Sequence, residues 1–78
     1  MNKNRRASIE DVKDQIEEIK QSIEEIRDEE DEAYNNLPDG VRDSGSDNAQ
    51  KMLDAVDHLE TAIDNLDNVV NALTEAQN

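Results

Sequence analysis

Residues 9–26, IEDVKDQIEEIKQSIEEI, decide the fold, because they place a large aliphatic residue at alternating intervals of three and four. These aliphatic residues are Ile9, Val12, Ile16, Ile19, Ile23 and Ile26. The spacing is the heptad pattern of a helix that packs along one side against another helix. The second half of the chain repeats it at Ala49, Met52, Val56, Leu59, Ile63, Leu66, Val70 and Leu73. The sequence therefore predicts two long amphipathic helices.

Capping residues predict where the first helix begins. Ser8 and Asp11 have the spacing of a capping box, in which each side chain bonds the backbone of the other residue. The first helix is therefore predicted at 8–36. The basic segment 1–7 is predicted to be a flexible tail, and 8–76 a single helical hairpin domain.

A proline marks the connection between the two helices. Pro38 has no N–H to donate and disfavours helical geometry at Leu37. Residues 37–43 are therefore predicted to form a loop. The second helix is predicted at 44–76, and the serine and aspartate residues at 44–47 are its N-cap candidates.

The two apolar patterns also predict how the helices align. An antiparallel, coiled-coil-like hairpin brings the apolar residues of the two helices opposite each other when Ile19 faces Ile63, and the one mixed pair is Glu30 with Met52. In this register Lys20 lies beside Glu60, and such exposed pairs select the register more than they add stability. The predicted fold class is all-α, an antiparallel two-helix hairpin.

One edge of the predicted hairpin is small and mostly uncharged. The candidate self-association residues on this edge are Ser22, Ala55, Ala62, Val69 and Ala76. Small residues let another helix approach closely, so we expect two hairpins to dimerise into an antiparallel four-helix bundle. Alternatively, the alanines only raise helix propensity.

Composition argues against an enzyme. The chain has 78 residues, no cysteine and a single aromatic residue, Tyr34. Catalytic sites use concave, largely apolar pockets, and two helices enclose none. The aspartates around the loop do not have the ligand spacing of an EF-hand. We therefore expect no catalytic residue, no cofactor and no metal site.

The charge balance points to basic partners. The chain carries 21 acidic and 8 basic residues, for a net charge of −13. Such a surface repels nucleic acid and anionic membranes and attracts basic protein surfaces. No apolar run approaches the ~20 residues of a membrane span, and the absence of cysteine fits the cytoplasm. We expect a cytoplasmic protein with no direct contact to nucleic acid or membrane.

The strongest concentration of charge lies where the first helix meets the loop. Negative charge there opposes the helix dipole, and Glu30 interrupts the apolar pattern. We interpret this region as a docking site for a basic protein surface, with Tyr34 as its aromatic anchor. The alternative is a solvated acidic face with no ligand. The candidate partner-binding residues are Asp28, Glu29, Glu30, Asp31, Glu32, Tyr34, Asp39 and Asp43.

The turn Asn35-Asn36-Leu37-Pro38-Asp39-Gly40 follows an acidic run and precedes a helix rich in Ala, Asp and Leu. In this combination, over residues 16–75, the chain resembles small acidic helical proteins of tailed phages and other mobile elements. Some of those proteins act against host defence by mimicking nucleic acid. Most proteins of this kind have no assigned function. The resemblance implies no catalytic residues, and the charge of this chain is compatible with an inhibitor of that kind in the cytoplasm of a bacterial host.

Two functions remain open from the sequence. The first is a protein-interaction module that docks on the basic surface of a nucleic-acid-binding protein. The second is a structural homo-oligomer, a coiled-coil scaffold or assembly protein with no charged ligand. Electrostatic docking weakens steeply with ionic strength, whereas apolar self-association does not.

Overall fold

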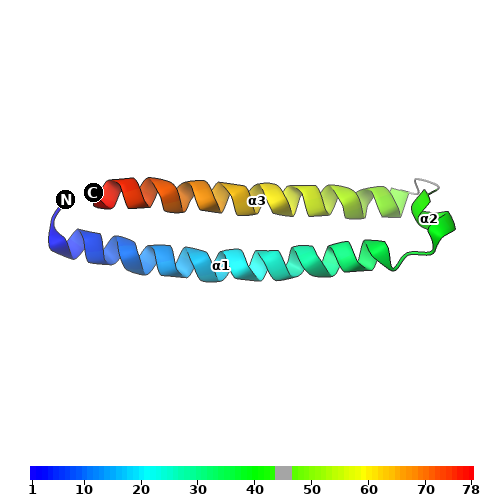
Figure 1. Cartoon of the computed structure of the whole chain (residues 1–78), viewed down its shortest axis with the longest axis horizontal. Coiled ribbons are helices and arrows are strands. Elements are labelled where there is room, and N and C mark those ends of the chain that lie inside the picture. Colours follow the sequence, from blue (N-terminus) through cyan, green and yellow to red (C-terminus); the bar gives the residue numbers. More distant parts are fainter. Residues whose placement is uncertain (44–46) are drawn as a thin grey trace.

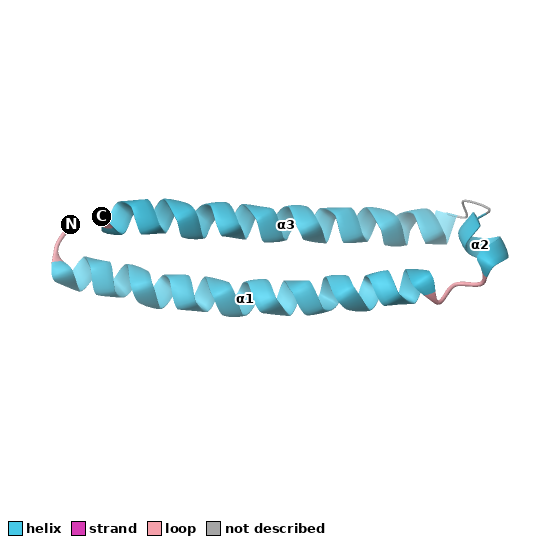
Figure 2. Cartoon of the chain, viewed as in Figure 1, coloured by secondary structure: helices cyan, strands magenta, loops and turns pink. Residues whose placement is uncertain are grey.

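The structure is a computed structural model that describes residues 1–43 and 47–78. Its elements are α1 (Lys3–Asn35), α2 (Asp39–Asp43) and α3 (Asp47–Gln77). The two long helices lie side by side and run in opposite directions, and α2 lies at the end where they are joined (Figure 1). Helix accounts for nearly all of the described chain, which contains no strand (Figure 2). The predicted all-α hairpin is confirmed.

Helix α1 begins earlier than predicted. The side chain of Asn2 accepts a hydrogen bond from the backbone N–H of Arg5 at 2.8 Å and so caps a helix that starts at Lys3. Asparagine is as effective an N-cap as serine. Ser8, the predicted cap, lies inside the helix and donates its hydroxyl to the carbonyl of Asn4 at 3.1 Å. Most of the predicted tail is therefore helical.

The predicted loop contains a helical turn. The carbonyl oxygen of Pro38 accepts hydrogen bonds from the backbone N–H groups of Val41 and Arg42, at 2.9 and 3.0 Å, and thereby starts α2. A proline can precede a helix in this way because only its N–H is missing. Helix α3 begins at Asp47. The other N-cap candidates, at 44–46, lie outside the described residues.

The seam between the long helices is a narrow strip. The buried or half-buried residues that α3 directs at α1 are Ala49, Met52, Val56, Leu59, Ile63, Leu66, Val70, Leu73 and Gln77. All but Gln77 belong to the predicted apolar pattern. Within the described part of the chain only Ala49 and Ile63 are buried, at 2% and 7% exposure. The hairpin therefore has almost no interior of its own.

Helix α1 is rotated relative to the prediction. Val12, Ile19 and Ile26, which were expected to face α3, are 44%, 52% and 52% exposed, so their predicted place in the seam is wrong. Apart from Glu24, the half-buried residues of the segment 1–37 follow a different pattern: Ile9, Lys13, Ile16, Lys20, Ile23, Arg27, Glu30, Tyr34 and Leu37. A basic residue one position later has thus replaced each exposed aliphatic residue. The long stems of lysine and arginine can cover apolar surface while the charged ends reach water.

The rotation changes the register. The Nζ atom of Lys20 lies 2.7 Å from an oxygen of Asp67, two helical turns beyond the predicted partner Glu60. The half-buried residues that α1 directs at α3 and the buried or half-buried residues that α3 directs at α1 pair one to one when Ile23 lies opposite Ile63. The predicted pairing of Ile19 with Ile63 is therefore wrong by about one turn.

Candidate functional surfaces

Ion contacts across the seam show which sides of the two helices share a face. The Nζ atom of Lys20 on α1 lies 2.7 Å from Asp67 on α3 and 3.8 Å from Glu17 on its own helix. Glu17 and Asp67 therefore border the seam from the same side. Residues at heptad intervals from these two lie on that side along the whole hairpin.

We call this side the acidic face. Carboxylates dominate its rows on α1 and make up half of its rows on α3, where Leu53 is 38% exposed. The seam beside this face supplies the cations Lys13, Lys20 and Arg27. The carboxylates of the acidic face are Glu10, Asp14, Glu17, Glu24, Asp28 and Asp31 on α1, and Asp57, Glu60, Asp64 and Asp67 on α3.

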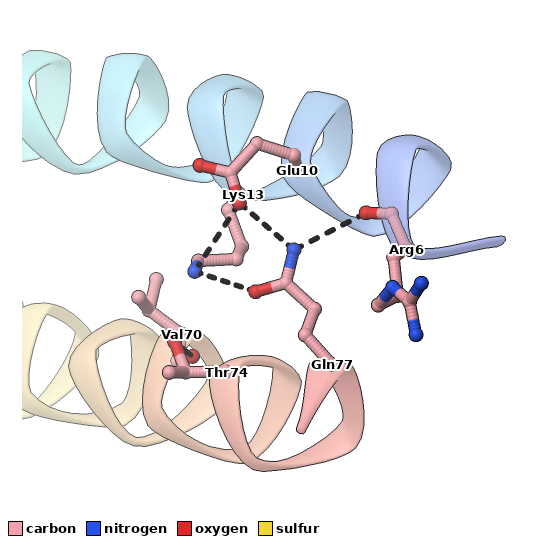
Figure 3. Close-up of polar contacts among 6 residues, drawn as sticks. All are labelled: Arg6, Glu10, Lys13, Val70, Thr74 and Gln77. Atoms are coloured by element: carbon pink, nitrogen blue, oxygen red, sulfur yellow. Dashed lines mark hydrogen bonds and ion pairs between the residues drawn. The ribbon is translucent and has the colours of Figure 1, made fainter. Parts of the chain in front are cut away.

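A polar cluster lies at one end of the acidic face, at the end of the hairpin that carries both termini (Figure 3). The side-chain oxygen of Gln77 accepts from Lys13 Nζ at 2.9 Å, and its nitrogen donates to Glu10 at 2.8 Å and to the carbonyl of Arg6 at 3.2 Å. The hydrogen bond from Gln77 and the positive charge of Lys13 lower the pKa of Glu10. The hydrogen bond to Asp67 raises the pKa of Lys20. Both shifts favour the charged forms that hold α1 against α3.

The opposite side of the seam is the apolar face. On α1 it presents Val12, Ile19, Ile26 and Ala33, and on α3 it presents Ala55, Ala62, Val69 and Ala76. Val69 is 43% exposed, which is similar to Val12. The rows that flank the face are Ser8, Gln15, Ser22 and Glu29 on α1, and Lys51, His58, Asn65 and Ala72 on α3. Glu29 is the one carboxylate in these four rows.

The predicted self-association edge forms part of this apolar face. Ala55 and Ala62 are half-buried, whereas Val69 and Ala76 are exposed. The hydroxyl of Ser22 donates to the carbonyl of Glu18 at 3.2 Å, so it is bonded to its own helix. The larger contribution to this face, the aliphatic row of α1, was not among the predicted self-association residues. The signal for it was the basic residue that follows each aliphatic one, since a seam can use long basic side chains as well.

The predicted docking cluster does not form one surface. Consecutive residues of a helix are about 100° apart around its axis, so the run 28–32 encircles α1. Asp28 and Asp31 lie on the acidic face, and Glu29 lies beside the apolar face. Glu30 is half-buried in the seam, and Glu32 points outward on the exposed side of α1.

The predicted docking residues also differ in how free their side chains are to contact a partner. Tyr34 is half-buried in the seam row of α1 and does not project as an anchor. An Arg27 nitrogen lies 3.0 Å from Asp28, and an Arg42 nitrogen lies 2.6 Å from Asp39. The side chain of Asp43 lies outside the described part of the structure.

The charges of α1 oppose its own dipole at both ends. Lys3, Arg5 and Arg6 lie at the beginning of the helix, whose first turn contains no acidic residue. Asp31 and Glu32 lie near its end, and its last turn contains no basic residue. A helix favours the reverse arrangement, by about 0.3–1 kcal/mol for each exposed charge at low salt.

Over residues 1–43 and 47–78 there is no pocket, no group of His, Cys, Asp and Glu side chains arranged to hold a metal ion, and no helix apolar and long enough to cross a membrane. No family model, curated protein or solved structure matches this chain.

Proposed function

We propose that the chain is a non-catalytic interaction module that binds a basic surface of another protein through its acidic face. The observation that carries this proposal is the separation of charge between the two faces. On the acidic face the carboxylates of α1 extend from Glu10 to Asp31 and those of α3 from Asp57 to Asp67, whereas Glu29 is the one carboxylate of the apolar face and its flanking rows. Other carboxylates, such as Asp11, Glu18 and Glu25, lie on the outer side of α1, but a uniform solubilising charge would not leave one side of the hairpin with a single carboxylate.

The chemistry of the face suggests the class of partner. Surfaces that hold a phosphate backbone already present spaced lysine and arginine side chains, and such a surface on a nucleic-acid-binding protein would complement the acidic face. Ten carboxylates over the 59 Å length of the hairpin give about one charge per 6 Å, compared with one per ~3.4 Å for a DNA strand. The module would therefore compete with nucleic acid for a basic surface without reproducing its charge density. A phage-like inhibitor acting in a bacterial cytoplasm fits this proposal.

Matched neutral variants test whether the face is the binding site. In the first, Glu17→Gln, Glu60→Gln and Asp64→Asn remove three charges from the acidic face. In the second, Asp11→Asn, Glu18→Gln and Glu25→Gln remove three charges from the outer side of α1, where all three residues are exposed. A third variant neutralises Asp28, Asp31 and Glu32 near the loop.

The binding measurement uses the immobilised chain, a cell lysate at low and high salt, and identification of the retained protein. The first variant should retain much less of that protein than the second. Added duplex DNA should release the retained protein from the immobilised wild-type chain. Equal losses in the first two variants would mean that the charge acts as a diffuse field with no defined site. A larger loss in the third variant would move the site to the loop end.

The second candidate function, a structural homo-oligomer, is favoured by a different observation. Val12, Ile19, Ile26 and Val69 leave large aliphatic side chains half-exposed on one face of a hairpin with almost no interior. Dimerisation into a four-helix bundle would cover them. Salt separates the two functions, because self-association through this face should persist at high ionic strength while docking of the acidic face should not.

A further inference from the structure

The apolar stripe of α1 is not directed at α3. α1 meets α3 through the rows that contain Ile16 and Lys20, whereas its aliphatic residues occupy the rows of Ile16 and Ile19. The rows of Ile19 and Lys20 are one residue apart, about 100° around the helix. The centre of the apolar stripe is therefore turned away from α3 by about half that angle.

This offset is the one that a four-helix bundle requires. In a bundle each helix directs its apolar stripe at the central axis, which lies between the directions to its two neighbours and about 45° from each. A free-standing pair of helices would instead place both stripes in the shared seam. Here the seam accepts Lys13, Lys20 and Arg27 while the row of Ile19 remains outside.

The occupant of the apolar face can be identified from the charges at the ends of α1. Arg5 lies at heptad spacing from Val12, Ile19 and Ile26, at the beginning of the exposed row. Glu29 lies beside the other end of that row. Neither side chain has an ion-pair partner among the described residues, and Arg5 opposes the dipole of α1 in its first turn. A second α1 that runs antiparallel across this face would bring the two charges together.

We propose that a second copy of this chain covers the apolar face, with the two copies antiparallel and their loop ends at opposite ends of the bundle. Ile19 lies on the two-fold axis and faces Ile19 of the second copy, and Val12 faces Ile26 of the second copy. Arg5 then lies within reach of Glu29 of the second copy, once on each side of the axis. This inference rests on the self-association proposed above and adds its interface and orientation.

The dimensions of the hairpin suit such an interface. Its broad face measures 59 by 15 Å between Cα atoms, an area of about 900 Å², and stable interfaces bury about 800 Å² of each partner. The same arrangement places the two acidic faces on the outside of the bundle. The face that is covered is the one where two chains of net charge −13 repel each other least.

Sedimentation of the full chain tests the occupant of the face. Ile19→Glu should weaken dimerisation about a hundredfold, because it replaces two facing aliphatic side chains by two like charges. The matched control, Gln21→Glu, adds the same charge to an exposed position away from the face and should leave the dissociation constant within about threefold of wild type. A wild type that is monomeric at high micromolar concentration would overturn both the inference and the proposed self-association.

Charge reversal tests the orientation separately. Arg5→Glu and Glu29→Arg should each weaken the dimer about tenfold, and the double reversal should restore it. Arg5 lies in the first turn of α1, where a negative charge matches the helix dipole better, so loss of helix cannot explain the weakening by Arg5→Glu. Since the chain has no cysteine, engineered disulfides give an independent readout. Chains with Val12→Cys should crosslink to chains with Ile26→Cys.

A parallel arrangement would place Ile19 over α3 of the second copy, near Val69. A dimer that crosslinks between Ile19→Cys and Val69→Cys, and is not restored by the double reversal, would overturn the orientation while self-association stands. A dimer unaffected by Ile19→Glu would show that another surface mediates it.

Discussion

Replacement of Glu30 by leucine should stabilise the hairpin. Glu30 is half-buried in the seam of α1, and the register places it opposite Val56. It also lies near the carboxyl end of α1, where the helix dipole disfavours negative charge. Glu30→Leu therefore removes an unfavourable charge and fills the seam with an aliphatic side chain.

The expected magnitude follows from these two effects. Full burial of a leucine side chain contributes about 1.5–3 kcal/mol, so a half-buried position should gain about 1 kcal/mol. Removal of the charge near the helix end adds about 0.3–1 kcal/mol. The free energy of unfolding should therefore rise by about 1–2 kcal/mol. For a domain of this size, 1 kcal/mol corresponds to a shift in Tm of about 4–8 °C.

Urea and thermal unfolding, followed by circular dichroism at one protein concentration, provide the measurement. The control is Glu32→Leu, which removes the same charge two residues away at an exposed position. It should gain the electrostatic contribution alone, so the two variants should differ by about 1 kcal/mol. Equal gains would refute the placement of Glu30 in the seam. A loss of stability in Glu30→Leu would show that its carboxylate has a favourable partner.

Three further outcomes follow from the register and the charges. A chain with cysteines at positions 23 and 63 should form a disulfide within one molecule, whereas cysteines at 19 and 63 should not; the reverse result would restore the predicted register. Stability should rise with salt, because a net charge of −13 repels itself and screening acts over a Debye length of ~10 Å at 0.1 M; a melting temperature independent of salt would contradict this. The raised pKa of Lys20, caused first by its bond to Asp67, gives a contribution to stability that is present below pH 10.5 and lost as pH rises beyond it. The difference in melting temperature between wild type and Lys20→Met should therefore shrink in alkali, and a constant difference would assign the effect of Lys20 to its alkyl stem.

The sequence predicted the architecture because its signals are local. Heptad spacing identified both helices, and Pro38 identified the connection between them. The start of α1 was missed because Asn2 and Ser8 are both good caps, and a basic segment does not prevent helix formation. The short α2 was missed because a proline followed by two turn-forming residues fits a turn and a helix start equally well.

The rotation of α1 could not be predicted from an isolated pair of helices. Three rows of residues on α1, at heptad intervals from Ile16, Ile19 and Lys20, could face α3, and the first two are aliphatic. Hydrophobicity alone places both aliphatic rows against α3. The structure places one of them there together with the basic row, because stems of Lys13, Lys20 and Arg27 cover apolar surface and Lys13 and Lys20 bond Gln77 and Asp67. The acidic run 28–32 was expected to be one site because its residues are consecutive in the sequence, although helical geometry distributes them around α1.

Because the acidic and apolar faces lie on opposite sides of the hairpin, they predict how many partner molecules each dimer can bind. If the apolar face is covered by a second copy, both acidic faces point outward and each dimer can hold two partner molecules. A partner immobilised at high density would then bind the dimer through two faces at once, which raises the apparent affinity by about 10²–10⁴ where both sites can be reached. The Ile19→Glu variant keeps its acidic face but lacks the second copy. Its affinity for a partner free in solution should equal that of wild type per chain, while its retention on the dense surface should fall towards the single-site value. If Ile19→Glu weakens binding equally in both formats, Ile19 itself contacts the partner, and the apolar face belongs to the docking site instead of to a dimer.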